Sequence, residues 1–576
     1  MPISFVCFSF DSKLSINATP TSTIGNHVIA TRQSKKNLEM FQKTLVATLR
    51  SCVCWQGGCR IGFILKKAGC SNGARANKPS KMNQRILCFI FVGLSGTPLP
   101  AQKYFDFSPR ATDAYQKIFS LRFEEAYLVL DGLQKQEPDN LIRIFLENTL
   151  EVLRIGVDDD AVAYSRLSKN MEARLSRLSR GEPRSPYYRY TQAEIRLQWA
   201  VLHARFGHYL SSLSDIKIGY ALLQENQQRF PDFMANYKSL GVLHVLVGNV
   251  PDDYRWAVRL FGGMQGDVRG GIAELESLLA YAENNAFLFQ EEVLMAYSLL
   301  QLNLNNQPEK AWNTLKNSRL NPQDNALAAF VMGNIALKSG HCDAAISILS
   351  GVPKGTAFYP FHYCDYLLGV AQLQRLDADA DLPLLRFVAN FKGENGLKEG
   401  YQKLAWHQLL QGKTAGYYHY MWQVKQQGNA RSDPDKVALR EANSGEIPDV
   451  RLLKARLLFD GGYYNRAFDL LKNNSADYDT NPRNKLEYQY RMGRIAQKSG
   501  KIDAAYHHYE TTIRLGENQP WYFACNAALQ IGILQEEAAD YKNARYWYQK
   551  CLAINPEEYA GSLHGKAKAG LNRLPE

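Results

Sequence analysis

Two segments near the C-terminus repeat one spacing of small and aromatic residues, and this repeat constrains the fold more than any other feature of the sequence. Counted from Gly493 and from Gly532, each segment has a small residue at position seven, an alanine at twelve and an aromatic residue at sixteen: Gly500, Ala505 and Tyr509 in the first, Ala539, Ala544 and Tyr548 in the second. Small residues let two antiparallel helices cross closely, and the aromatic ring fills the space toward the next hairpin. The spacing therefore predicts stacked helix hairpins.

Upstream segments match the pattern less regularly, beginning at Ala455, at Gly333 and at Ala114. The sequence between them carries apolar residues at steps of three and four, and we find no strand-type alternation bounded by turn residues. A body of about 475 residues exceeds one compact core, which a solenoid tolerates because each hairpin needs to contact only its neighbours. We therefore expect an all-α solenoid of antiparallel helix hairpins.

The repeat resembles the tetratricopeptide repeat (TPR), although its two glycines lie 39 residues apart, a longer spacing than the 34 residues typical of that family. The resemblance implies a protein that binds a protein or peptide partner in a concave groove made by the first helix of each hairpin. By this resemblance, the groove-facing positions are Arg456, Tyr490, Arg494, Gln497 and Lys498. Most of them are polar or cationic, so we expect an acidic or carboxylate-bearing segment in the partner.

A glycine-rich stretch after an apolar helix departs from the plain pattern. The order of apolar helix, Gly-x-x-Gly-Asp turn and amphipathic helix resembles the inclusion-body clearance proteins and the related tetratricopeptide domain-39 family, through Gly263, Gly266, Asp267 and Gly271. This resemblance implies an intracellular or organelle-targeted protein as an alternative. A simpler interpretation is a tight interhelical turn, with Asp267 capping the helix that follows.

The stretch that starts at Met82 has the three parts of a secretory signal peptide: Arg85, an apolar run from Ile86 to Leu94, and the small residue Ala101 before Gln102. The apolar run is too short for a permanent transmembrane helix. We therefore expect a periplasmic or secreted protein, with peripheral association with the cell envelope as an option. Ten of the twelve net positive charges lie before this stretch, in a segment that is a disordered arm, a transit peptide or untranslated upstream sequence.

We divide the chain into five parts by these features. They are a basic disordered extension, a signal peptide, an N-terminal helical TPR-like region, a central helical TPR-like region, and C-terminal TPR repeats with a capping helix: residues 1–81, 82–101, 102–320, 321–445 and 446–576. The capping helix is expected to pack its apolar side on the last repeat and to turn a basic side to solvent.

The short stretches that resemble phosphate-binding, calcium-binding or zinc-binding motifs each lack a required residue. A phosphate loop ending at Lys413 would need a glycine at position 407, where this sequence has a histidine. The acidic run from Asp377 lacks the glycine and the glutamate that a calcium loop requires. The cysteines from Cys52 to Cys70 supply at most one pair of a zinc site. Cys525 and Cys551 fall on helical positions where a small apolar residue packs.

We therefore expect no enzymatic activity, no metal and no cofactor. We also expect no nucleic-acid partner, because the body is nearly neutral. Besides the exported scaffold, the sequence leaves open the intracellular protein of the inclusion-body clearance type and a glycan-binding outer-membrane component. Such components are usually lipoproteins, which carry a cysteine directly after the cleavage point, and the residue directly after Ala101 is Gln102.

Overall fold

The computed structural model describes residues 102–248, 266–473, 475–478 and 480–575, with the side chains of residues 476 and 477 left out. The expected basic extension and signal peptide lie outside these residues. Within them the only extended pairing is an isolated bridge between Tyr104 and Asn140, so the expected all-α fold is confirmed. The α-helices are α3 (Pro109–Phe119), α4 (Phe123–Gln136), α5 (Ile142–Asp158), α6 (Ala161–Leu167), α7 (Met171–Leu178), α8 (Pro186–Arg205), α9 (Tyr209–Arg229), α10 (Ala235–Gly248), α12 (Val268–Asn284), α13 (Gln290–Asn303), α14 (Pro308–Lys316), α15 (Ala326–Lys338), α16 (Cys342–Ser350), α17 (His362–Arg375), α18 (Asp381–Asn390), α19 (Leu397–Leu410), α20 (Thr414–Gln426), α21 (Asp433–Ser444), α22 (Val450–Asp460), α23 (Tyr464–Leu471), α24 (Pro482–Lys498), α25 (Ile502–Gly516), α26 (Phe523–Glu537), α27 (Tyr541–Ala553) and α28 (Ala560–Arg573).

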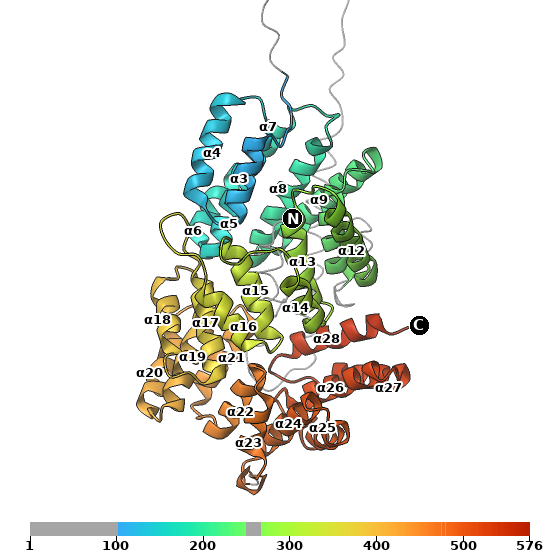
Figure 1. The fold of residues 1–576 in the computed structure, drawn as a ribbon. Helices are drawn as coiled ribbons and strands as arrows, with labels where there is room; N and C mark the ends of the chain where they lie inside the picture. Colours follow the sequence, from blue (N-terminus) through green and yellow to red (C-terminus); the bar gives the residue numbers. More distant parts are fainter. Residues whose placement is uncertain (1–101, 249–265, 474, 479, 576) are drawn as a thin grey trace, which may run out of the picture. The chain divides into compact units, whose positions relative to one another are not determined.

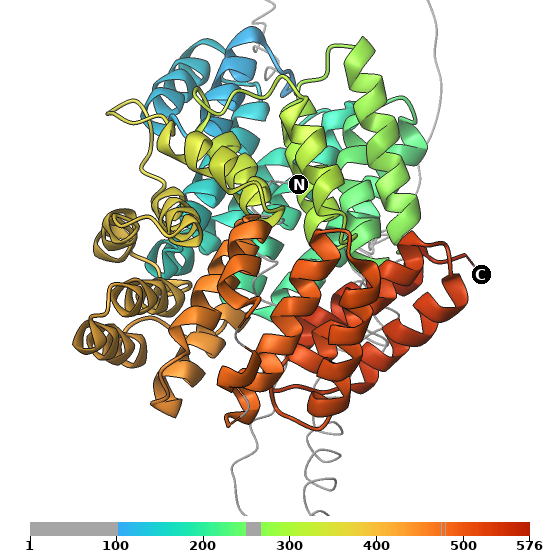
Figure 2. The ribbon, with the colours of Figure 1, turned by 60° about the horizontal axis from the view of Figure 1, so that its bottom comes forward.

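Consecutive helices pair as antiparallel hairpins, which is the expected solenoid organisation (Figure 1). In the C-terminal part the hairpins form two layers. Helices α22, α24, α26 and α28 contact one another in succession, and we call them the first-helix layer. Helices α23, α25 and α27 pair with them as the second-helix layer, and Figure 2 shows this part in orange and red. This arrangement brings side chains from successive first helices together.

The repeated glycines lie where the helices of a hairpin cross. A Cβ atom on Gly493 would lie 2.8 Å from the Tyr509 ring, and one on Gly532 would lie 2.7 Å from the Tyr548 ring. The ring of Tyr548 also approaches Gly570 of α28, where a Cβ atom would lie 2.4 Å away. The structure thus confirms that small residues permit the crossing and that the aromatic residue also reaches the next helix.

In the glycine-rich stretch, Asp267 caps the helix that follows it, as the simpler interpretation expects. The carboxylate of Asp267 caps α12, because Oδ2 accepts a hydrogen bond from the backbone N–H of Gly270 at 2.7 Å. Gly271 lies at the crossing of α12 with α10, where a Cβ atom would be 2.7 Å from the carbonyl oxygen of Gly241. Gly263 lies outside the described residues.

In the central region, helices that are distant in the chain also pack on one another. The turn between α22 and α23 packs on the turn between α15 and α16, and α17 contacts α22. The Tyr463 hydroxyl donates to Asp343 Oδ1 at 2.8 Å, across 120 positions of sequence. Helices α18–α21 lie between α17 and α22 in the chain, and Trp406 of α19 and Tyr417 of α20 share one core cluster with Leu373 of α17 and Leu457 of α22.

Contacts continue across the expected boundaries near residues 320 and 445, through α14 with α15 and α17 with α22. The described helices belong to one compact unit, and the three helical regions remain a prediction. Among the helices that the structure describes, none has the length and hydrophobicity required to cross a membrane.

We expect Gly462→Ala to lower the free energy of unfolding by about 3–5 kcal/mol, because the residue has a left-handed backbone and no room for a side chain. Its φ is +87°, and a Cβ atom would lie 1.9 Å from the carbonyl oxygen of Gly340. Urea denaturation followed by circular dichroism measures the loss.

Gly500→Ala is the matched control, since Gly500 has φ +73° with nothing within 4 Å of its Cβ position. It should lose only about 1–2 kcal/mol, the cost of the left-handed conformation alone. Equal losses in the two variants would show that the contact between the two turns contributes nothing.

Candidate functional site

The residues expected to face the groove all lie on the first-helix layer, Arg456 on α22 and the other four on α24. The Arg494 guanidinium lies 4.6 Å from the centroid of the Phe459 ring on α22, and its Nη1 donates to the Tyr490 hydroxyl at 2.8 Å. The Arg456 guanidinium lies 4.9 Å from the Trp406 ring. Thus α22 and α24 present two arginines held against aromatic rings.

The other two expected groove residues, Gln497 and Lys498, lie near the C-terminal end of α24 and have different surroundings from the two arginines. The Gln497 side-chain oxygen accepts a hydrogen bond from the hydroxyl of Tyr509, so its amide serves the contact between α24 and α25. Lys498 is exposed at the end of α24. A partner contact by either residue stays a prediction.

Lys566 of α28 is a further member of this region that the sequence did not identify. Burial, and then the positive charges of Arg494 and Lys338, lower the pKa of the Lys566 ammonium to about 8. The basic side of α28 was expected to face solvent, but Lys566 is partly buried and faces other cations. We call Arg494, Lys338 and Lys566 the cation cluster; Arg456 is linked to it through Asp460, whose charge acts on both Arg456 and Arg494.

Carboxylates near the cluster compensate it only in part. Asp460 Oδ2 lies 3.8 Å from Arg456 Nε, and Glu487 forms an ion pair with Arg491 at 2.8 Å. In the part of the chain that the structure describes, no carboxylate forms an ion pair with Arg494 or Lys566, and Arg494 Nε is a buried donor with no acceptor. Arg494 and Lys566 therefore offer positive charge that the described residues compensate only through the more distant Asp460, and Arg494 Nε is a free donor.

Aromatic residues form the neutral wall beside the cluster. The ring centroid of Tyr490 lies 5.7 Å from that of Tyr522, which lies 5.3 Å from that of Tyr559. Asn526 Nδ2 donates to the Tyr490 hydroxyl at 2.7 Å. This hydroxyl accepts from both Asn526 and Arg494, and Tyr490 is buried, so it holds these two donors in place from within the fold.

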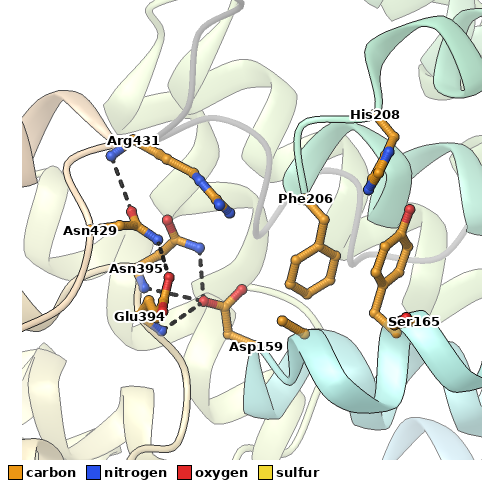
Figure 3. Close-up of a pocket in the computed structure, with 10 residues that line it drawn as sticks. Asp159, Ser165, Phe206, His208, Glu394, Asn395, Asn429 and Arg431 are labelled. Carbon is orange, nitrogen blue, oxygen red and sulfur yellow. Dashed lines mark hydrogen bonds between the residues drawn. The ribbon is translucent and has the colours of Figure 1, made fainter.

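A pocket of about 230 Å³ lies elsewhere, between the α5–α6 segment and the loops that precede α19 and α21 (Figure 3). Asp159 holds one side of it: Oδ2 accepts from Asn395 Nδ2 at 2.7 Å, and Oδ1 accepts from Arg205 Nε at 2.5 Å. On the opposite side Tyr164 stacks on Phe206, and burial raises the pKa of Tyr164 to about 12. The bonds of Asp159 join segments distant in sequence, so we assign this residue a structural role.

A buried ion network ties together helices in the N-terminal half. The Lys238 ammonium on α10 lies 3.1 Å from Glu194 Oε2 on α8 and 2.9 Å from Glu292 Oε1 on α13. All three side chains are at most 2 % exposed. No local sequence pattern indicated this network, because the partners are 44 and 54 positions apart.

Within the described residues, no group of three or more histidine, cysteine, aspartate or glutamate side chains could hold a metal ion. The cysteines from Cys52 to Cys70 lie outside them. No protein-family model matches the chain, and no curated protein matches it significantly.

We expect Lys566→Gln to stabilise the protein at about pH 7 by about 1–2 kcal/mol, a value reduced for the partial exposure of the side chain. The lysine is charged at that pH in both states, and only the folded state carries the cost of its burial and the repulsion from Arg494 and Lys338. Because the folded pKa is about 8 and the unfolded value about 10.4, the wild type gains stability as pH rises between these values. The advantage of the variant should therefore shrink toward about pH 10.

Urea denaturation at several pH values measures this difference. Lys542→Gln, at an exposed position of α27, is the control for loss of one lysine and should change stability by less than about 0.5 kcal/mol. An advantage of Lys566→Gln that is absent, or that stays constant with pH, would contradict the placement of Lys566 among cations.

Proposed function

We propose that this protein is a non-catalytic TPR-type scaffold that binds an acidic segment of a protein or peptide along its first-helix layer. The observation that supports this proposal is the cation cluster, in which Arg494 and Lys566 come together without an ion-pair partner among the described residues. Like charges brought together in a partly buried place reduce stability. An anionic ligand would reverse that effect.

The chemistry of the cluster favours carboxylates. A carboxylate oxygen can accept from Arg494 Nε and from the Lys566 ammonium, and such charge-assisted hydrogen bonds are stronger than neutral ones. The rings of Tyr490 and Tyr522 are buried, so they support these donors from within the fold, and a partner would contact mainly the cations. A nucleic acid would need a longer basic surface than these few cations provide.

The resemblance to the inclusion-body clearance proteins adds no second candidate. Asp267 and Gly271, two of the residues that carry it, have the capping and packing roles described above. We therefore retain the general TPR-type function.

Binding to a fluorescent glutamate-rich peptide, with a glutamine-rich peptide of equal length for comparison, tests the proposal. The full chain should bind the glutamate-rich peptide more tightly, and binding should weaken with salt. Lys566→Gln and Arg494→Gln should each weaken it by roughly tenfold, because each removes a donor and a charge from a partly desolvated site.

Lys542→Gln and Arg514→Gln, both exposed on the second-helix layer, are the matched controls and should bind as the wild type does. Circular dichroism of each variant confirms that it is folded. Equal affinity for the two peptides, or equal effects of cluster and control variants, would remove the first-helix layer as the binding surface.

We also propose that the chain is exported, on the strength of the signal-like stretch that begins at Met82. The N-terminus and intact mass of the protein from fractionated native cells test this. We expect a chain that starts at Gln102 in an envelope or secreted fraction. A chain that starts at Met1 in an intracellular fraction would contradict export and direct attention to the basic extension.

A further inference from the structure

Two buried cysteines face each other across the last hairpin. Cys525 is the third residue of α26, and Cys551 lies near the end of α27. Their Sγ atoms are 3.6 Å apart, and both side chains are fully buried. The turn of this hairpin lies at the other end of both helices, so the two thiols meet at its open end.

The surroundings of the pair differ from those of the other cysteines in the described residues. Cys342 on α16 uses its thiol as a donor to the carbonyl oxygen of Ala371 at 3.0 Å, and no contact joins it to Cys364 on α17. Cys525, in contrast, has a side-chain hydrogen bond with His564 of α28 in addition to its contact with Cys551. The ring of His564 is fixed by a hydrogen bond of Nε2 with the carbonyl oxygen of Ile554 at 2.9 Å.

This arrangement distinguishes the two thiols chemically. The hydrogen bond from Cys551 lowers the pKa of Cys525, and the contact with His564 lowers it further against the opposing effect of burial. The same hydrogen bond, together with burial, raises the pKa of Cys551. The thiolate is the form that attacks a disulfide, so Cys525 is the member of the pair suited to react first.

We propose that Cys525 and Cys551 are a modification site at which an intrachain disulfide forms between α26 and α27. A small-molecule disulfide is the oxidant, and it reaches the pair during folding or when the hairpin opens locally. The Cys525 thiolate attacks one sulfur of the oxidant and releases one thiol, which takes the proton that Cys525 lost.

The Cys551 thiolate then attacks Cys525 Sγ in the mixed disulfide, and a second thiol leaves with the proton of Cys551. The protein loses two hydrogen atoms and two electrons, and the small disulfide is reduced to two thiols. The proposal does not depend on the identity of the partner that the first-helix layer binds.

The disulfide would secure the open end of the hairpin. The two cysteines are 26 positions apart, so the bond would restrict the unfolded chain and oppose separation of α27 from α26. Helix α26 carries Asn526, which holds the Tyr490 hydroxyl, and Tyr522 precedes it by one turn. Oxidation would therefore also reduce local opening next to the cation cluster.

Peptide mapping tests the proposal. The full chain is incubated with oxidised glutathione in the folded state and, in parallel, refolded in its presence; remaining thiols are then blocked with iodoacetamide under denaturing conditions before digestion. We expect a Cys525–Cys551 linked peptide by at least one route, with Cys342 and Cys364 alkylated. Hydrogen exchange in α26 and α27 should slow by at least about tenfold in the oxidised protein.

Cys525→Ala is the variant that removes the bond, and Cys364→Ala is its matched control at another buried cysteine. The difference in exchange between oxidised and reduced protein should vanish in the first and persist in the second. If Cys525→Ala does not fold, the linkage pattern of the wild type decides alone. Absence of the linked peptide by both routes, or linkage of Cys525 to Cys342 or Cys364 as often as to Cys551, would overturn the proposal.

Discussion

The close crossing of two helices within each hairpin is the constraint on which the rest of this structure depends. Gly532 leaves the space that the Tyr548 ring occupies, and the same ring reaches Gly570 of the next helix. One aromatic residue therefore sets two spacings, within a hairpin and from that hairpin to the following one. Because successive first helices are brought into contact in this way, side chains from α22, α24 and α28 meet although each belongs to a different repeat.

The first helices use charge in two opposite ways. In the N-terminal half Lys238 lies between two glutamates, whose charges offset the cost of burying its ammonium group. In the C-terminal half Arg494 and Lys566 approach each other, and burial, followed by the charge of Arg494, lowers the pKa of Lys566. The hairpin architecture requires neither arrangement, and the second is the one on which the proposal of an anionic partner rests.

Sequence spacing predicted the hairpins well because the interactions that define a hairpin are local. Gly493 and Tyr509, for example, are 16 positions apart and contact each other across one turn. The same reasoning assumed that each repeat packs on the next repeat along the chain. It therefore missed the contact between the Gly340 and Gly462 turns and the meeting of Lys566 with Arg494, since nothing in a periodic pattern says that α17 also packs on α22. The cysteine pair could have been found, because Cys525 and Cys551 lie at similar distances on either side of one short turn.

The inserted helices also determine which cations are available to a ligand. Trp406 of α19 lies beneath the Arg456 guanidinium, and the Lys403 ammonium lies 4.0 Å from the same ring. Arg456 also has Asp460 nearby, so its charge is partly satisfied within the chain. Arg494 contacts aromatic rings as well, but its Nε lacks an acceptor. A carboxylate would therefore gain most from the pair formed by Arg494 and Lys566, with Arg456 as a secondary contact. This order follows from the insertion of α18–α21 and not from the repeat itself.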